Sequence, residues 1–134
     1  MKRNRKNTLR SFLFACLGLT VTTIMVAGVS AMITPPSQLG RPDALDIQET
    51  KCRIMYRIPD NDGGEPVKNY YIEYKNQWNL SWKFRGTSKG LEYQFKNMRE
   101  GSMAQFRVSA SNSAGIGNPS YGSNFIKFRG PFSE

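Results

Sequence analysis

The chain of 134 residues has room for one domain with one hydrophobic core. It contains no histidine, no nucleophile–base pair and no phosphate-binding glycine loop, so we predict neither enzymatic activity nor a cofactor. The net charge of +9 suggests nucleic acid, but five basic residues lie within the first ten positions. The rest has a mixed surface charge, which predicts no nucleic-acid partner.

The first 31 residues have the pattern of a targeting segment. A basic head is followed by an uncharged stretch from Ser11 to Gly40, which is predominantly apolar between Phe12 and Ile33. Small residues at Val29 and Ala31 fit signal-peptide cleavage after Ala31. The apolar run also approaches the roughly 20 residues that span a bilayer. We therefore expect residues 1–31 to be a signal peptide or signal anchor, an N-terminal hydrophobic targeting or transmembrane helix.

Residues 32–42 contain three prolines and predict an extended linker. From there to residue 129 the dominant pattern is alternation of apolar and polar residues with turn residues between the runs, which is typical of half-buried strands. Residues 130–134 form a tail. The expected inward-facing positions are Leu45 and Ile47; Cys52, Ile54, Tyr56 and Ile58; Tyr70, Ile72 and Tyr74; Trp82 and Phe84; Leu91, Tyr93 and Phe95; Phe106, Val108 and Ala110; Ile126 and Phe128. Seven short strands predict an all-β, seven-stranded antiparallel immunoglobulin-like sandwich.

Neither a disulfide nor a metal is expected in this domain. Cys52 is the only cysteine after residue 31, so no intradomain disulfide is available. Asp46, Asp60 and Asp62 lie in or near turns, but they lack the later glutamate of an EF-hand. We interpret them as turn residues, and the domain as a monomer held together by packing.

Two motifs carry a resemblance to a known family. The turn Pro59-Asp60-Asn61-Asp62-Gly63-Gly64 and the following run Val67-Lys68-Asn69-Tyr70-Tyr71-Ile72-Glu73-Tyr74-Lys75 resemble the second and third strands of a fibronectin type III domain. The segment from Gly101 through Phe106-Arg107-Val108-Ser109-Ala110 to Ser120 is similar to the sixth strand and the loop that follows it. Within the family, these motifs look most like the modules of titin and twitchin.

The resemblance implies an antiparallel sandwich of three plus four strands that works as a protein-binding or spacing unit. Two positions depart from the family pattern. Tyr56 stands where the family has a core tryptophan, and Ala104 where it has a tyrosine that packs on the sheet end and bonds the preceding turn. We expect the vacated ring site to be filled only in part, with the flexible Met103 as the nearest substitute.

Candidate contact residues lie around the fourth strand. If Trp82 and Phe84 point inward, Lys83 and Arg85 point outward, and the same alternation adds Lys75 and Arg107 to form a basic stripe. Such a stripe would attract an acidic partner, but we favour its interpretation as a solvated face balanced by Glu73, because spaced charges of this kind are common. Trp78 is either an exposed contact anchor or folded back onto the sheet edge.

Asn79-Leu80-Ser81 is a glycosylation sequon, meaningful only in the secretory lumen. The integrin-binding tripeptide of some family members is absent from Asn112 to Ser120. The main hypothesis is therefore an interaction or spacer module with an unidentified protein partner, secreted or held on a single-pass membrane segment, on the extracytoplasmic side. The alternative is a structural module of a titin/twitchin-like muscle filament protein in the sarcomere or cytoplasm, with the N-terminal segment a by-product of an incomplete gene model.

Overall fold

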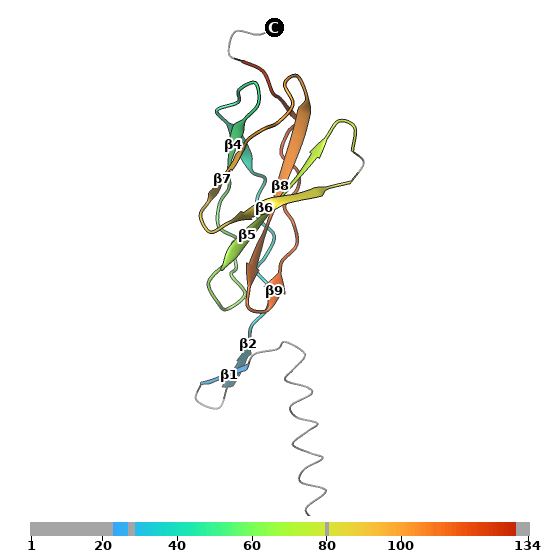
Figure 1. Ribbon diagram of the computed structural model, residues 1–134. Helices are drawn as coiled ribbons and strands as arrows, with labels where there is room; N and C mark the ends of the chain where they lie inside the picture. The colour runs from blue at the N-terminus through green and yellow to red at the C-terminus, as the bar shows by residue number, and fades with distance from the viewer. Residues whose placement is uncertain (1–22, 27–28, 80, 131–134) are drawn as a thin grey trace, which may run out of the picture.

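The computed structural model describes residues 23–26, 29–79 and 81–130 (Figure 1). This part of the chain is all β, with no helix. A hairpin comes first, formed by β1 (Thr23–Val26) and β2 (Val29–Met32). The remaining strands are β3 (Asp43–Leu45), β4 (Cys52–Met55), β5 (Asn69–Asn76), β6 (Lys83–Ser88), β7 (Glu92–Phe95), β8 (Met103–Asn112), β9 (Gly115–Ile116) and β10 (Ile126–Lys127).

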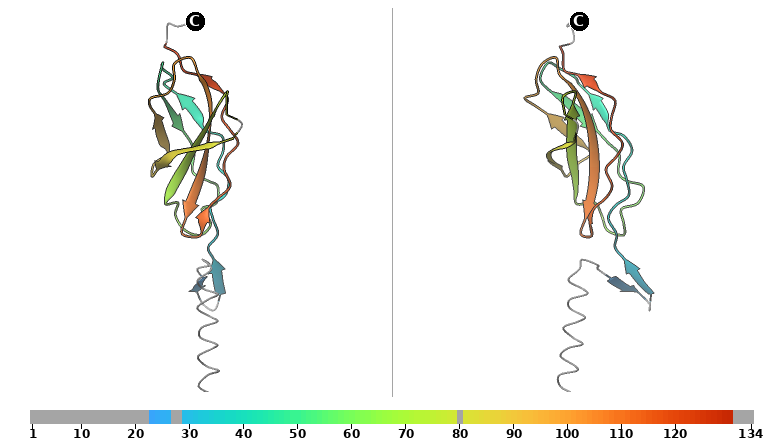
Figure 2. Two further views of the ribbon diagram at one scale, coloured as in Figure 1. Left: turned by 45° about the vertical axis from the view of Figure 1, so that its right-hand side comes forward. Right: turned by 90° about the vertical axis from the view of Figure 1, so that its right-hand side faces the viewer.

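These strands form two antiparallel sheets. One sheet has the order β3-β4-β7, and the other has the order β10-β8-β5-β6, with β9 added by pairing with β8. The two further views show the sheets lying face to face as two layers (Figure 2). The three-stranded sheet is the one that the resemblance implies, whereas the other sheet has five strands in place of four because two short strands, β9 and β10, both pair with β8.

The expected N-terminal helix is not seen where it can be checked. Its residues 1–22 lie outside the described residues, and the two described stretches that follow form the β1–β2 hairpin, in which Ala31 pairs with Ile24. No helix in the described ranges is long and apolar enough to cross a membrane.

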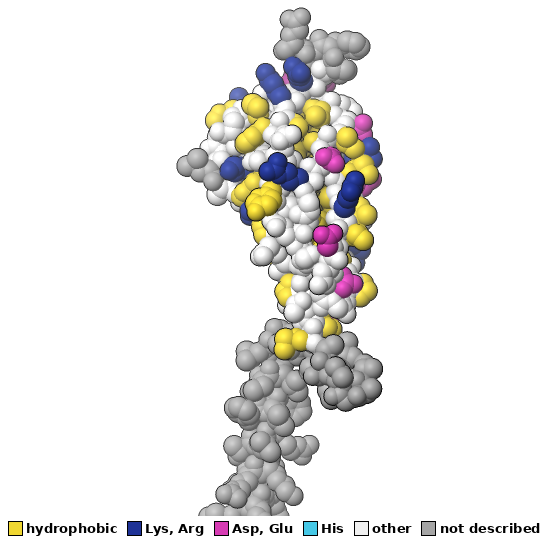
Figure 3. Space-filling view, turned by 180° about the vertical axis from the view of Figure 1, so that it is seen from behind, with side chains coloured by type: hydrophobic (Ala, Val, Ile, Leu, Met, Phe, Trp, Pro, Cys, Tyr) yellow, Lys and Arg dark blue, Asp and Glu magenta, His cyan; other side chains and the backbone are white. Residues whose placement is uncertain are grey.

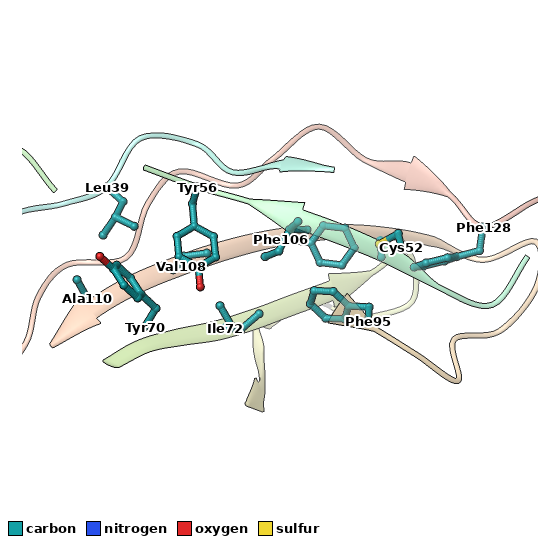
Figure 4. Packing of buried hydrophobic residues seen from close by; sticks show 12 residues of the cluster. Leu39, Cys52, Tyr56, Tyr70, Ile72, Phe95, Phe106, Val108, Ala110 and Phe128 are labelled. Carbon is teal, nitrogen blue, oxygen red and sulfur yellow. The ribbon is translucent and has the colours of Figure 1, made fainter. Parts of the chain in front are cut away.

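Alternation along the strands places the core between the sheets. Tyr70, Ile72 and Tyr74 of β5 lie opposite Ala110, Val108 and Phe106 of β8. Residues opposite each other in an antiparallel pair share a face, so all six point to the same side. Figure 4 shows Tyr56 and Cys52 pointing toward them from the other sheet. The Phe95 ring of β7 and the Phe106 ring of β8 contact each other at a centroid distance of 4.4 Å. This aromatic contact joins the two sheets.

Residues 32–42, expected to be an extended linker, run alongside the domain and pack on it. Leu39 belongs to the buried cluster, and Figure 4 places it beside Tyr70 and Ala110. The Thr34 N–H donates to the Gly63 carbonyl at 3.0 Å, and the Ser37 N–H donates to the Asn61 carbonyl at 2.8 Å. From residue 33 to residue 42 the segment lacks regular strand pairing, which is consistent with three prolines that have no N–H to donate.

The two departures from the family pattern are accommodated differently. Tyr56 is buried, packs against Tyr70 at a ring distance of 5.0 Å, and donates its hydroxyl hydrogen to the Gly90 carbonyl at 2.8 Å. The polar group that distinguishes this tyrosine from a hydrocarbon ring therefore has a partner.

At Ala104 the expectation that Met103 fills the vacant ring site is wrong. Met103 lies opposite Lys127 and is 38% exposed, because neighbours along a strand point to opposite faces. Phe128 is instead fully buried in the cluster that contains Ala104. Its N–H donates to the Ser102 carbonyl at 2.9 Å, and its carbonyl accepts from the Gly101 N–H at 2.7 Å. Phe128 thus takes over the sheet end.

Candidate protein-binding face

The outward face of the β8-β5-β6 sheet gathers charged and aromatic side chains. Tyr71, Glu73 and Lys75 alternate along β5 with the core residues, so they point away from the other sheet. Arg107 lies opposite Glu73 in the register of β5 with β8, and its side chain is on the same face. Each of these side chains is partly buried, which indicates that they pack against one another on the face.

Trp82 is the centre of this face. The Lys75 Nζ lies 5.4 Å from the centroid of the Trp82 ring, and the Arg107 Cζ lies 4.7 Å from it. Both distances fall within the range of cation–π attraction. The Arg107 Nε also forms an ion pair with the Glu73 Oε1 at 2.9 Å. Two cations therefore converge on one indole, and one carboxylate balances only one of them.

The expected basic stripe is not formed as predicted, because the prediction placed β6 with the wrong face inward. Phe84 pairs with Glu73, so it points outward, and it is 63% exposed. The Phe84 ring lies 6.2 Å from that of Tyr71 on the same face. Lys83 pairs with the inward-facing Tyr74 and belongs to the opposite side of the strand.

Arg85 also leaves the outward face. A shift of register occurs between Ile72 and Glu73 of β5, where Arg85 has no opposite residue. The Arg85 Cζ lies 5.7 Å from the Tyr74 ring centroid, and its NH2 donates to the Lys96 carbonyl at 2.6 Å. Its guanidinium therefore closes the open side of the sandwich, and only Lys75 and Arg107 of the four predicted cations are brought together.

Trp78 lies in the turn between β5 and β6 and is 59% exposed. The Asn76 Oδ1 accepts from the N–H groups of Trp78 and Asn79 at 2.9 Å each, which fixes the turn. The Arg99 Cζ lies 5.2 Å from the Trp78 ring. Trp78 is therefore exposed and not folded back onto the sheet edge, and its role as a contact anchor stays a prediction.

The sequon residue Asn79 is oriented unfavourably for glycosylation. Its Nδ2, the atom that would carry the glycan, is buried and has no hydrogen-bond partner in the described part of the chain. A glycan on this atom would require the turn to open. The other candidate for processing, the bond after Ala31, lies within β2.

The strands of the two sheets differ in charge. Strands β3, β4 and β7 carry Asp43, Glu92 and one basic residue, Arg53, which bridges Asp46 at 2.9 Å and Glu92 at 3.0 Å. Figure 3 shows the molecule from behind: the acidic side chains lie on the right-hand half of the view, and the basic side chains are spread over both halves. Strands β5, β6, β8 and β10 carry one acidic residue, Glu73, and five basic residues: Lys75, Lys83, Arg85, Arg107 and Lys127.

The acidic turn acts as a backbone turn. The Asp62 Oδ1 accepts from the Gly64 N–H at 2.8 Å, and the Asn61 Oδ1 accepts from the Gly63 N–H at 2.8 Å. Within residues 23–26, 29–79 and 81–130, no three metal-ligating side chains are grouped so that they could hold an ion. Nearby, hydrogen bonding from Ser113 and the charge of Lys68 lower the pKa of the Glu65 carboxyl.

Comparison with known proteins identifies the family. The fibronectin type III domain profile matches residues 34–126, so the chain belongs to the fibronectin type III family. Domains of this family are generally non-enzymatic interaction modules. The relatives of this chain are muscle proteins that carry such modules. This agrees with the sequence-based resemblance to the modules of titin and twitchin.

Particular relatives show the scale of the match. The chain is 33% identical over 91 residues to a cardiac-type myosin-binding protein C of Gallus gallus, covering 66% of this chain and 7% of that protein. It is 32% identical over 73 residues to a titin homolog of Caenorhabditis elegans, covering 54% of this chain and, to the nearest per cent, 0% of that protein. A solved structure of titin kinase and its flanking domains superposes with a TM-score of 0.67 at 25% identity, covering 69% of this chain and 17% of that one.

The chain thus spans less than a tenth of the length of these curated relatives. They favour the muscle-filament interpretation over delivery to the extracytoplasmic side.

Sequence reasoning missed the role of Trp82 and Phe84 as surface residues. Alternation assigns residues to one face or the other but does not say which face is inward. Glu73 and Lys75 mark the outward face of β5 in the sequence. The sequence does not give the register between β5 and β6, which is needed to assign Trp82 and Phe84 to the same face.

Proposed function

We propose that this chain is a non-enzymatic structural and protein-interaction module of a titin/twitchin-like muscle filament protein. The support is the combination of a fibronectin type III domain with relatives in which one such match covers only a small share of a long protein. A module of this kind holds its neighbours at a fixed spacing and offers its sides to partners.

The geometric observation that carries this proposal is the placement of the two ends. The chain reaches the domain at the end that holds β9 and leaves it at the opposite end (Figure 1). Thr34 is bonded to Gly63 at the first end, and Phe128 is bonded to Gly101 and Ser102 at the second. Backbone hydrogen bonds therefore hold the entering segment at one end of the domain and the leaving segment at the other, as an in-line spacer requires.

The proposal is tested by expressing the full chain with a C-terminal fluorescent tag in cultured striated muscle cells. Association with the myofilaments appears as a regular striated pattern that survives detergent extraction of the membranes. A signal confined to the secretory compartments or the medium contradicts the proposal.

Delivery to the extracytoplasmic side is the second candidate, favoured by the basic head and the uncharged stretch from Ser11 to Gly40. The same cells separate the two functions. Cleavage after Ala31, seen as a loss of the first 31 residues by mass spectrometry, supports delivery. A glycan on Asn79 does so too, although the burial of its Nδ2 makes that modification the less expected of the two.

A further inference from the structure

We propose that the outward face centred on Trp82 is a docking site for an extended acidic segment of a partner protein. The face is defined by Tyr71, Glu73, Lys75, Trp82, Phe84 and Arg107. This inference rests on the proposed function only in taking the partner to be a protein.

The charge on this face is left without internal balance. Arg107 is bound to Glu73 through its Nε at 2.9 Å and its NH2 at 3.3 Å. In the described part of the chain, the ammonium group of Lys75 forms no ion pair. The Trp82 ring holds the Lys75 ammonium 5.4 Å from its centroid, so this cation is positioned before any ligand arrives. A carboxylate of a partner would supply the missing counter-charge.

An apolar contact lies beside this charge. The exposed Phe84 ring is tilted against that of Tyr71 with 6.2 Å between the ring centroids, and the partly exposed Trp82 lies two positions before Phe84. Clusters of aromatic residues surrounded by polar groups are the usual anchors of protein interfaces. A partner with an aromatic or aliphatic side chain between acidic residues therefore fits both features of the face.

The sheet edge itself is less suited to binding than the face. The unpaired edge of β6 carries the features that block strand addition, a lysine at Lys83 and the irregularity at Arg85. The occupant is therefore expected to lie across the side chains of β5, β6 and β8.

The test is a binding titration of the full chain with a fluorescein-labelled peptide of about ten residues, in which glutamate alternates with threonine around one central phenylalanine. We expect the anisotropy to rise to saturation, and to remain flat with the same peptide carrying lysine in place of glutamate. Lys75→Glu is expected to weaken binding by about tenfold or more, because it places like charges together. Lys75→Met, which keeps the stem and removes the charge, is expected to act in the same direction by less.

Matched controls separate a site from general attraction between opposite charges. Lys51→Glu makes the same change of charge beside the other sheet and is expected to alter binding by less than about twofold. Phe84→Ser is expected to weaken binding, whereas Ile58→Ser, at another exposed apolar residue, is not. Equal losses for Lys75→Glu and Lys51→Glu, at unchanged urea midpoints, overturn the proposal.

Two other ligands complete the test. A heparin-derived oligosaccharide or phosphatidylserine vesicles that bind in a Lys75-dependent manner, without binding of the glutamate peptide, overturn the protein partner in favour of a glycan or a membrane. Failure of the docking proposal is distinguishable from failure of the proposed function. If the peptide does not bind but the chain still gives a striated pattern in muscle cells, and Lys75→Glu does not change that pattern, the docking site is overturned and the proposed function stands.

Discussion

At the scale of single residues, Ala104 shows how the domain closes one end without the tyrosine that the family carries there. Ala104 pairs with Ile126, and Phe128 follows two positions later on the same face as Ile126. Figure 4 places Phe128 beside Cys52 at the end of the core. The turn before β8 is bonded by the Ser102 hydroxyl, which donates to the Arg99 carbonyl at 2.6 Å. A phenylalanine and a serine thus share the packing and hydrogen bonding of one tyrosine.

This packing predicts that Ala104→Tyr destabilises the domain. Ala104 is fully buried, so a new ring has to displace its neighbours, and overpacking typically costs about 1–3 kcal/mol. Urea titrations of the full chain measure the change in the free energy of unfolding. Phe128→Ala alone is expected to cost about 3–5 kcal/mol, and clearly less in the Ala104→Tyr background, where the new ring fills the space. A higher urea midpoint for Ala104→Tyr alone would show that the site is open.

Cys52 predicts a pH dependence of stability. Its thiol is buried, and burial raises its pKa from 9.0 to about 12. Between these values the thiol of the unfolded chain ionises while the native thiol keeps its proton, so the unfolded state binds fewer protons and the free energy of unfolding falls as pH rises. Burial also raises the pKa values of Tyr56 and Tyr70, which adds to the decline. Cys52→Ala is therefore expected to lose stability less steeply from pH 9 to 12 in urea titrations, and parallel curves would contradict this.

At the scale of elements, two serines replace part of an edge strand. Along residues 117–125, which lack strand pairing, Ser120 and Ser123 each bond one residue of β8 twice. The Ser120 N–H donates to the Val108 carbonyl at 2.8 Å, and its Oγ accepts from the Val108 N–H at 3.0 Å. Ser123 bonds Phe106 in the same way, at 2.7 and 2.9 Å. The side chains thus satisfy the buried N–H groups that a paired strand would otherwise satisfy.

Removing either hydroxyl is expected to leave a buried N–H group without an acceptor. Ser120→Ala and Ser123→Ala should each lower the free energy of unfolding by about 1–3 kcal/mol. Ser113→Ala is the control, because the Ser113 hydroxyl donates to Glu65 at the surface, and a change within about 0.5 kcal/mol is expected. Chemical denaturation of the unchanged chain and of the three variants measures these differences in the free energy of unfolding. Equal midpoints for Ser120→Ala and Ser113→Ala would show that water supplies the missing acceptor.

The elements also show where sequence reasoning ends. Periodicity located the strands around Ile54, Ile72 and Val108 because one face of each is buried. It placed β6 with the wrong face inward, because Trp82 and Phe84 are large and apolar but lie on the surface, where two cations contact Trp82 and the Tyr71 ring contacts Phe84. The role of Phe128 depends on a register between β8 and β10 that no local pattern contains.

At the scale of the whole molecule, one buried amide connects three distant segments. The Asn112 Nδ2 donates to the Thr34 carbonyl at 2.7 Å and to the Asp62 carbonyl at 2.8 Å. Its Oδ1 accepts from the Ala114 N–H at 2.9 Å. Gly63 lies beneath this contact with φ of 83°, and a Cβ there would collide with the Thr34 carbonyl oxygen. The N-terminal segment is thereby fixed to the two loops at this end of the domain.

This connection predicts that Asn112→Ala loosens one end of the domain before the rest. Two carbonyls and one N–H lose their partner, and each lost bond of this kind is worth about 0.5–1.5 kcal/mol. Because these contacts lie at the end of the sandwich, the Thr34 and Ser37 amides should open locally while those of β5 and β8 keep the protection set by global unfolding. Hydrogen exchange of the full chain, followed by mass spectrometry, resolves the two regions. Asn118→Ala, at an exposed residue of the same loop, is expected to leave both unchanged. Loss of protection across β5 and β8 at the same rate as Thr34 would instead mean that this end and the core unfold as one cooperative unit.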